Sequence, residues 1–285
     1  MAQFLREAID SVLAQTYPAV EYIVRDGGST DGTLQLLAGY GERVQWRSGR
    51  DGGAAAALRG AFGEARGEIF GWLNADDILR PEAVAGAVAA LAEHPRAVGV
   101  FGRAAWISEE GGHIADYPVC AEAIQLLDRE CRICQPACFF RAEAYRAAGG
   151  IDPAWGSAFD YDLWIRLARQ GPFVYAAEDW ARSRMHRRNK TLGNRGQAFE
   201  EGMAVLERHF GYVPPNWIHS HWLWRHDGRD QFFDKARGNA FTWLASLPAG
   251  LRRNRGRRAR YLWDWLMAPA GGARLRRRSP PVPAR

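Results

Sequence analysis

The sequence contains no long apolar run. Its 285 residues are 47% hydrophobic and 25% charged, which is typical of a globular protein large enough to bury a core. No stretch approaches the roughly 18 consecutive apolar residues that a membrane-spanning helix needs. The Ala-rich segment 84–91 lies between Glu82 and Glu93 and predicts a packed helix. Arg6 and Glu7 stand where a secretory signal has its apolar core, so we expect a cytoplasmic protein.

Cysteine is scarce, and its spacing is not that of a zinc finger. Cys131 and Cys134 form a C-x2-C pair, but no second pair of cysteines or histidines follows at a suitable distance. Cys134 also opens the apolar stretch "CQPACFF", which predicts a buried strand. A zinc site and buried free thiols both stay open, and the pattern favours free thiols for all four residues, which are Cys120, Cys131, Cys134 and Cys138.

Most of the chain carries no net positive charge. The formal net charge is +6, but residues 251–285 contain eleven arginines and one aspartate, a net of +10, which leaves −4 for residues 1–250. The basic character therefore belongs to the C-terminal segment. Because no nucleic-acid-binding motif accompanies it, we expect no nucleic-acid partner.

Helix-like and strand-like segments alternate over the first 192 residues. Periodicity predicts helices at 3–15, 30–41, 54–66 and 80–95, and strands at 20–24, 44–48, 68–73 and 97–107. The alternation predicts an α/β fold with a mostly parallel sheet and helices on both faces. No G-x-G-x-x-G follows any of these strands, which argues against a dinucleotide-binding oxidoreductase.

The character of the chain changes after residue 192. Half of the 12 tryptophans lie beyond it, and "KARGNAFTWLASL" and "RARYLWDWLMA" predict amphipathic helices. We expect a helical, aromatic-rich extension over 193–267 and a basic disordered tail over 268–285. Two interpretations stay open: packing on the first domain, favoured for 200–250, and attachment to an anionic membrane surface, favoured for 251–278.

Three groups of carboxylates adjoin predicted elements. Asp26 ends the first strand, within "YIVRDGGSTDGT". Asp76 and Asp77 follow the strand-like "GWL", with Asn74 just before them, and Asp160 stands at the start of the helix "DYDLWIRL". In open α/β sheets, ligands bind at the carboxyl ends of strands. The groups therefore predict a binding site.

Each group also has a purely structural interpretation. Asp26 fits a capped turn, and Asp160 fits a helix N-cap. Asp76 and Asp77 fit a solvated turn, but two adjacent acids favour a neutralising cation. Mg²⁺ is suited to one or two carboxylates together with substrate phosphates, and a carboxylate such as Asp160 can serve as a general base.

Six motifs occur in the order typical of one family. They are "DGGSTDGT", "GWLNADD", "CQPACFF", "GGIDPAW", "DYDLWIRL" and "HRRNKT". Over roughly residues 3–192 the chain resembles the inverting glycosyltransferases of family 2, which have the GT-A fold. The resemblance implies a metal-dependent enzyme that moves a sugar from a nucleotide-sugar donor to a glycan or lipid-linked acceptor in cell-surface glycan or polysaccharide synthesis. The rival hypothesis is a non-catalytic nucleotide-sugar binder or scaffold.

The resemblance assigns donor-binding roles to several of these residues. Asp26 falls where the family contacts the nucleotide base, and Asn74 falls where it approaches the ribose. Asp51 opens the stretch "DGGAAAALRGA" and is expected in the same donor site. Gln135, expected on the strand beneath the acceptor side, is counted with the donor-binding residues. His186 matches a position that reaches the diphosphate or the metal.

The metal and catalytic roles follow in the same way. Asn74-Ala75-Asp76 occupies the family's Asp-x-Asp site, whose last acid ligates Mn²⁺ or Mg²⁺, and Asp77 extends it. Asp160 matches the base that deprotonates the acceptor hydroxyl.

Two departures from the family pattern bear on these expectations. The family often has "DRGQSDAINKG" where this chain has "DGGAAAALRGA", so three polar residues become Gly52, Ala56 and Arg59. The family also begins with a strand ahead of the helix at 3–15, and from its absence we expect the natural start to lie upstream of Met1.

Overall fold

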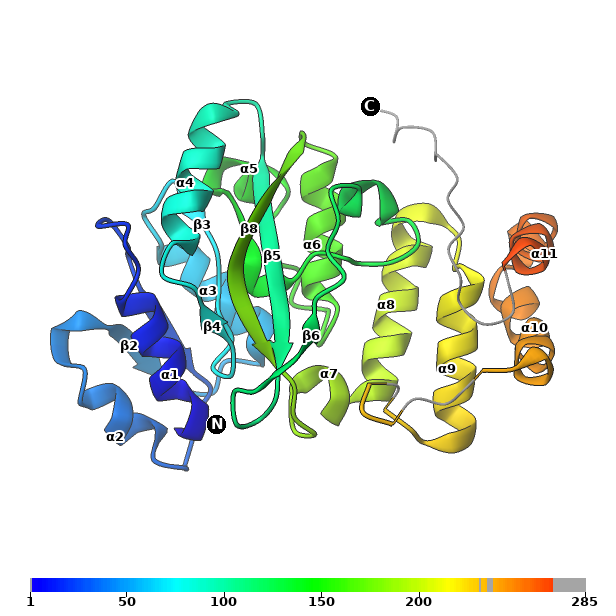
Figure 1. Ribbon diagram of the computed structural model, residues 1–285, viewed down its shortest axis with the longest axis horizontal. Helices are drawn as coiled ribbons and strands as arrows, with labels where there is room; N and C mark the ends of the chain where they lie inside the picture. Colours follow the sequence, from blue (N-terminus) through cyan, green and yellow to red (C-terminus); the bar gives the residue numbers. More distant parts are fainter. Residues whose placement is uncertain (1, 231, 235–237, 269–285) are drawn as a thin grey trace. The chain divides into compact units, whose positions relative to one another are not determined.

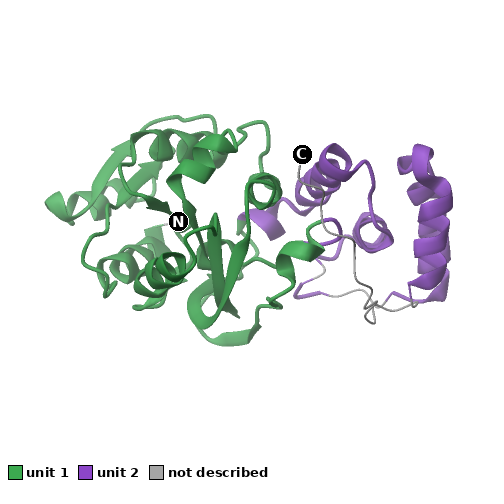
Figure 2. Ribbon diagram, turned by 90° about the horizontal axis from the view of Figure 1, so that it is seen from above, with its two compact units in different colours: residues 1–127, 131–189 green, residues 128–130, 190–285 purple. Residues whose placement is uncertain are grey.

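The computed structural model describes residues 2–230, 232–234 and 238–268. The chain divides into two compact units (Figures 1 and 2): unit 1 comprises residues 1–127 and 131–189, and unit 2 comprises residues 128–130 and 190–285. The division after residue 189 lies close to the boundary expected at 192. Apart from its first residue, the predicted tail at 268–285 lies outside the described residues.

Unit 1 begins with the predicted alternation of helices and strands. Its first elements are α1 (Ala2–Leu13), β1 (Ile23–Asp26), α2 (Thr33–Ala38), β2 (Gln45–Ser48), α3 (Ala54–Glu64), β3 (Ile69–Phe70), β4 (Ile78–Leu79), α4 (Ala83–Glu93), β5 (Gly99–Ile107) and β6 (His113–Asp116). Then come the 3₁₀ turn η3 (Gln135–Ala137), β7 (Cys138–Arg141), α5 (Ala142–Ala147), α6 (Phe159–Ala168) and β8 (Phe173–Arg184). The helix predicted over 3–15 is confirmed as α1, which buries Leu5, Ile9 and Val12 at helical spacing.

The strands of the described residues form two sheets. β1 and β2 pair in parallel, with Asp26 opposite Ser48. The larger sheet has the order β3–β7–β5–β8–β4, with β6 paired to β5; within it, β5–β8 is parallel and the other pairs are antiparallel. The α/β class is confirmed, but the sheets are mixed rather than mostly parallel. One reason is the short turn between β5 and β6, since such a turn can join only antiparallel strands.

The third predicted strand, "EIFGWL", is shorter than expected. Only Ile69–Phe70 pairs with β7. A Cβ on Gly71 would lie 2.7 Å from Cδ1 of Phe139, so this glycine lets the backbone pass close to that ring. The Trp72 carbonyl then accepts a hydrogen bond from Nε2 of Gln135 at 2.5 Å, which replaces a strand partner. The segment that carries "NADD" is therefore an irregular loop fixed by side chains.

Two hydrophobic cores hold the elements of unit 1. The smaller joins α1 and α2 to the β1–β2 sheet through Leu5, Ile9, Leu37, Tyr40 and Val44. The larger packs α4 on β5 and β8 (Figure 1), with the fully buried Trp180 of β8 in it. Gly102 of β5 faces that indole, and a Cβ there would lie 2.5 Å from its Cδ2. The packing of Trp180 against β5 therefore requires a glycine at position 102.

Unit 2 is helical. It contains α7 (Lys190–Gly193), α8 (Arg195–Phe210), α9 (Pro215–Asp227), α10 (Ala240–Arg253), the 3₁₀ turn η4 (Arg255–Arg257) and α11 (Arg258–Met267). The two predicted amphipathic helices are confirmed as α10 and α11. None of the helices in the described part of the chain has both the length and the apolar composition needed to cross a bilayer.

Candidate active site

Asp26 ends β1 and organises the loop that follows it. Its carboxylate accepts hydrogen bonds from the backbone N–H of Gly28 at 3.1 Å and of Ser29 at 3.0 Å, and from the hydroxyl of Ser48 on β2 at 2.5 Å. Burial raises its pKa, but these donors outweigh burial, so the pKa of Asp26 lies below its ordinary value. Asp26 is therefore an ionised acceptor at a strand end, where the sequence predicted it.

Asp51 lies beside the same loop. Its carboxylate accepts a hydrogen bond from the N–H of Gly53 at 2.9 Å, and its oxygens are 3.7 Å from where a Cβ on Gly27 would stand. A larger residue than glycine at position 27 would thus reach the Asp51 carboxylate. The loop after β2 thus places Asp51 beside Gly27, the residue that follows Asp26.

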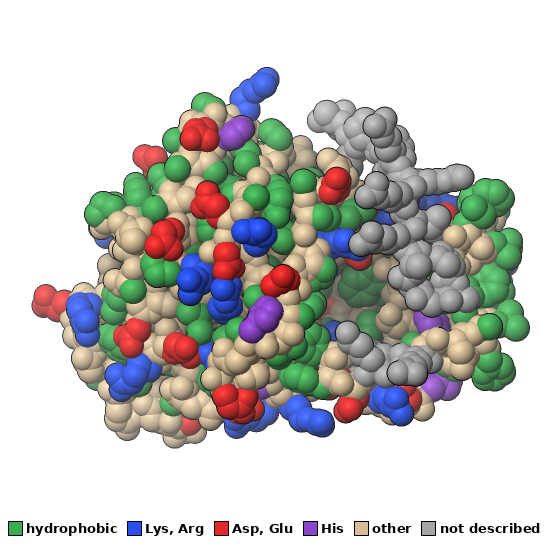
Figure 3. Space-filling model, in the orientation of Figure 1, with side chains coloured by type: hydrophobic (Ala, Val, Ile, Leu, Met, Phe, Trp, Pro, Cys, Tyr) green, Lys and Arg blue, Asp and Glu red, His purple; other side chains and the backbone are tan. Residues whose placement is uncertain are grey.

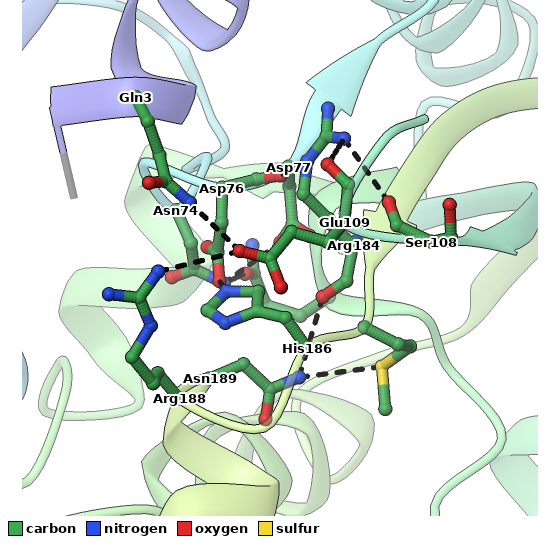
Figure 4. A network of polar contacts seen from close by, with 12 residues as sticks. Gln3, Asn74, Asp76, Asp77, Ser108, Glu109, Arg184, His186, Arg188 and Asn189 are labelled. Atoms are coloured by element: carbon green, nitrogen blue, oxygen red, sulfur yellow. Dashed lines mark hydrogen bonds and ion pairs between the residues drawn. The ribbon is translucent and has the colours of Figure 1, made fainter. Parts of the chain in front are cut away.

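Asp76 faces His186, which follows β8 (Figure 4). His186 Nε2 is 3.1 Å from Oδ2 of Asp76, and the imidazole is only 2% exposed. Its other nitrogen, Nδ1, is buried without a hydrogen-bond partner, and its ring lies 5.0 Å from that of Phe4 on α1. The two side chains come from positions 110 residues apart, so only the fold joins them.

Asp77 points inward. It is 4% exposed, and its Oδ1 accepts a hydrogen bond from the backbone N–H of Arg184 at 2.9 Å, while its Oδ2 accepts one from Asn74 Nδ2 at 3.0 Å. Burial and then the charge of Asp76 raise the pKa of Asp77 to about 7. Both oxygens of Asp77 accept hydrogen bonds from groups of the protein itself, whereas the carboxylate of Asp76 faces His186.

Asn74 and Gln135 connect this loop to η3. Asn74 Nδ2 also donates to Oε1 of Gln135 at 2.9 Å, and the amide of Gln135 in turn holds the Trp72 carbonyl. The expectation that Gln135 lies on a strand was wrong, because Gln135 begins a 3₁₀ turn with Pro136 as its second residue, and β7 starts only at Cys138. Gln135 nevertheless contacts Asn74 through this hydrogen bond.

Asp160 lies in the first turn of α6 and is not its N-cap. Ala158 occupies the cap, and Asp160 Oδ1 accepts a hydrogen bond from the N–H of Tyr161 at 2.7 Å. α6 is fixed against the "GWLNADD" segment by the stacked rings of Trp72 and Trp164, whose centroids are 5.3 Å apart. The start of α6 is thereby held near the loop that carries Asn74.

The thiol of Cys134, which directly precedes η3, is buried. Burial, and then the nearby charges of Asp77 and Asp160, raise the pKa of Cys134. The preference for buried free thiols is confirmed for Cys134 and Cys138.

Arg184 is a site residue that the sequence did not reveal. Its buried guanidinium donates to the carbonyls of Asp76 at 3.0 Å and of Glu109 at 2.9 Å, and it forms an ion pair with Glu7 of α1 (Figure 4). It therefore ties the Asp76 loop to the β5–β6 turn and to α1. Its only sequence signal is the stretch "RSRMHRRNK", in which four arginines look alike.

The facing groups fit a divalent cation. A carboxylate oxygen of Asp76 and an imidazole nitrogen of His186 are ligand types used by such ions. Nε2 is the nitrogen of His186 that faces Asp76, and Nδ1 is buried without a hydrogen-bond partner. Among the described residues, no group of three or more His, Cys, Asp and Glu could hold a metal alone. Further ligands would have to come from a bound molecule.

Comparison with known proteins identifies relatives for this architecture. The family model described as "Glycosyl transferase family 2" matches residues 2–146, about half of the chain. An uncharacterized glycosyltransferase of Rickettsia felis is 30% identical over 200 residues, covering 65% of this chain and 32% of the relative. A chondroitin synthase of Pasteurella multocida is 26% identical over 196 residues, covering 68% of this chain and 20% of the relative. The chain thus spans only about a third or less of the length of these two relatives.

Solved structures show the same fold. A complex of S. aureus TarS 1–349 with UDP-GlcNAc superposes with a TM-score of 0.61 at 14% identity, covering 88% of this chain and 78% of that chain. The mannosyltransferase PcManGT from Pyrobaculum calidifontis, in complex with GDP-Man and Mn²⁺, gives 0.57 at 20% identity, with 88% and 72% covered. The expected GT-A type fold is confirmed by these likenesses.

Proposed function

Because the chain belongs to glycosyl transferase family 2, we propose that it transfers a sugar from a nucleotide-sugar donor to an acceptor hydroxyl, with inversion at the anomeric carbon. The observation that carries the proposal is the 3.1 Å pairing of Asp76 with the buried His186. Asn74 and Asp77 hold that loop in place, and Asp160 lies in the same unit. A cation held by this pair, together with a general base in the same unit, would suit one-step transfer from a diphosphate donor.

We assign the nucleotide end of the donor to the loops after β1 and β2. Three hydrogen-bond donors fix the orientation of the ionised Asp26 carboxylate. It can therefore accept hydrogen bonds from the nucleotide base of the donor without rearranging. Asp51 adds a second acceptor beside it. Ala75, between Asn74 and Asp76, packs on the same core as β1 and β2. That packing supports one continuous donor site from the base to the diphosphate.

Asp76 and His186 would hold Mn²⁺ or Mg²⁺ together with donor phosphate oxygens. When bound, such an ion offsets the negative charge that develops on the departing diphosphate. Arg184 fixes the Asp76 backbone from the buried side, and Asp77 fastens the same loop to β8. These contacts keep the Asp76 carboxylate aimed at His186. Asp77 is therefore proposed as a positioning residue rather than a direct ligand.

Asp160 is the proposed general base. It lies in the first turn of α6, where the helix dipole favours its ionised form. An ionised carboxylate accepts the acceptor hydroxyl's proton while that oxygen attacks the anomeric carbon and the diphosphate leaves from the opposite face. One displacement of this kind inverts the configuration, by the stereochemical logic established for glycosidases.

The acceptor is proposed to be a growing glycan or a lipid-linked sugar in cell-surface glycan or polysaccharide synthesis. Relatives named chondroitin synthase and hyaluronan synthase support a glycan acceptor. The proposed place of action is the inner face of the cell membrane.

A donor screen tests the proposal. Melting temperature is measured with UDP-GlcNAc, GDP-mannose and other nucleotide sugars, each with Mn²⁺ and with EDTA, and release of nucleoside diphosphate is then followed for every donor that stabilises the protein. The enzyme hypothesis predicts Mn²⁺-dependent binding followed by turnover. Binding without turnover would favour the non-catalytic binder. One feature fits that alternative: Arg59, which stands where the family often has a polar donor-site residue, donates instead to the carbonyls of Gly149 and Ile151.

A further inference from the structure

The last two helices of unit 2 form a hairpin with a well-defined inner side. The indoles of Trp243 and Trp265 stack with centroids 5.9 Å apart, and Trp265 Nε1 donates to the Trp243 carbonyl at 3.3 Å. Near the turn, the fully buried Tyr261 lies against Gly250, where a Cβ would be 1.9 Å from its Cζ. These contacts fix which sides of α10 and α11 face inward.

The opposite sides of both helices are apolar and exposed. Of ten exposed large hydrophobic side chains in the described residues, six belong to this hairpin: Phe241 (74% exposed), Leu244 (58%), Leu262 (38%), Trp263 (58%), Leu266 (68%) and Met267 (40%). Figure 3 shows hydrophobic side chains gathered over the part of unit 2 that contains α10 and α11. Spacings of three and four residues place them on one face of each helix. We call these six residues the apolar face.

A basic cleft adjoins the apolar face at the turn between the helices. It has a volume of about 560 Å³ and is lined by Pro248, Leu251, Arg252, Arg255 and Arg258. Arg258 Nε donates to the Leu251 carbonyl at 3.3 Å, which holds this guanidinium at the end of α10. The three arginines are exposed, and within the described residues none of them forms a salt bridge.

Two neighbouring arginines, in contrast, form salt bridges. Arg253 is paired with Glu200 and Glu207, and Arg260 is paired with Asp264. Arg253 is thus neutralised by α8 and Arg260 by its own helix, whereas the arginines of the cleft have no acidic partner among the described residues. Residues 240–267 contain six arginines and one aspartate, a net charge of +5.

Exposed aromatic and aliphatic side chains next to unpaired guanidinium groups are the pattern of a helix pair that lies in a lipid–water interface. Guanidinium groups bind phosphate oxygens with two hydrogen bonds each, and three of them line one cleft. We propose that the α10–α11 hairpin binds the surface of an anionic phospholipid bilayer. The apolar face enters the headgroup and acyl boundary, and the cleft receives a lipid phosphate. This inference does not depend on the proposed glycosyl transfer.

Co-sedimentation of the full chain with vesicles tests the proposal. One set of vesicles contains phosphatidylcholine alone, and the other contains phosphatidylcholine mixed with phosphatidylglycerol. We expect binding to the mixed vesicles that weakens as salt rises, and much weaker binding to phosphatidylcholine. Soluble glycerol phosphate at the same concentration of phosphate should compete poorly, because it lacks the chains that contact the apolar face. Equal competition would show a simple phosphate site and overturn the bilayer proposal.

Substitutions then locate the surface. Each arginine near an anionic membrane contributes roughly a fivefold gain in partitioning, so replacing Arg252, Arg255 and Arg258 together by alanine should reduce binding about a hundredfold. The matched control removes the same charge from unit 1 through Arg43→Ala, Arg96→Ala and Arg146→Ala, and should change binding only slightly.

The apolar face is tested by Leu244→Gln combined with Leu266→Gln. Each inserted leucine is worth roughly tenfold or more in partitioning, so the pair should cost about a hundredfold. The control pair, Val20→Gln with Ile114→Gln, changes exposed apolar residues of unit 1 and should leave binding intact. All variants should keep the wild-type melting temperature, since the changed side chains are exposed.

Three outcomes would overturn the proposal. The first is no vesicle binding at low salt. The second is binding that the hairpin variants leave unchanged, which would move the membrane contact elsewhere, such as to the arginines after residue 268. The third is a dimer in light scattering that the leucine variant dissociates, which would make a second copy of the chain the partner of the apolar face.

Discussion

The buried carboxylate of Asp77 should make the stability of unit 1 fall as pH rises through neutrality. Burial beside Asp76 raises its pKa from 3.8 to about 7. A folded-state pKa above the unfolded value means that the native state binds the proton more tightly. The resulting stabilisation is fully present below pH 3.8 and is lost as pH rises through about 7.

The size of the effect follows from that shift. The difference is about three pKa units, and one unit corresponds to roughly 1.4 kcal/mol, so the free energy of unfolding should fall by about 4 kcal/mol between pH 4 and pH 8. For a unit of this size, roughly 2–4 °C of melting temperature accompanies each kcal/mol, which predicts a decrease of about 8–16 °C.

Asp77→Asn isolates this contribution. The asparagine oxygen can still accept the hydrogen bond from the Arg184 N–H, but the side chain no longer ionises. The lost bond from Asn74 costs about 1 kcal/mol at every pH. Chemical denaturation in EDTA, from pH 5 to pH 8, should therefore show the variant gaining stability relative to the wild type as pH rises. Glu93→Gln, at an exposed carboxylate, is the control and should follow the wild type. If the Asp77→Asn curve also ran parallel to the wild type, the burial account of Asp77 would be refuted.

The remaining predictions concern Asp76 as a metal ligand, the hydrogen bond from Ser48 to Asp26, and the α10–α11 hairpin. Asp76→Asn should weaken Mn²⁺-dependent UDP or GDP binding in calorimetry, as EDTA should in the wild type; unchanged affinity in both would contradict the metal assignment. Ser48→Ala removes a donor to the ionised Asp26 and should cost about 1.5–3 kcal/mol in denaturation at pH 7; no loss would show that the hydroxyl is dispensable. Gly250→Ala should destabilise the α10–α11 hairpin by about 1–3 kcal/mol through overpacking, whereas Gly256→Ala, which has open space, should be near neutral; equal melting temperatures would refute the packing argument.

Local sequence was sufficient for features that depend on neighbouring residues. Asp26 was predicted at a strand end because a carboxylate followed by two glycines is a local signal, and the structure gives it backbone donors two and three residues ahead. The α10 and α11 helices were predicted in the same way, from the spacing of their apolar residues.

Long-range pairing decided what local sequence could not. Asp76 and Asp77 are chemically identical and adjacent, yet one faces His186 and the other turns inward because it bonds to the backbone of Arg184, 107 residues away. Gly71, directly after β3, likewise lies against the ring of Phe139, which is far along the chain. The strand directions were misjudged because alternation indicates an α/β class without fixing how each strand is reached.

In the proposed mechanism, Asp160 acts as the general base in a transfer from a nucleotide sugar. The most direct measurement is release of nucleoside diphosphate, with Mn²⁺ and a donor identified by the screen, by the wild type and by Asp160→Asn. Asparagine keeps the size of the side chain but cannot accept a proton at neutral pH, so turnover should fall by roughly 10²–10⁴-fold while donor affinity stays nearly unchanged. Equal turnover by the two proteins, with only a lower melting temperature for the variant, would show that Asp160 is a structural residue of α6 and would contradict the proposed mechanism.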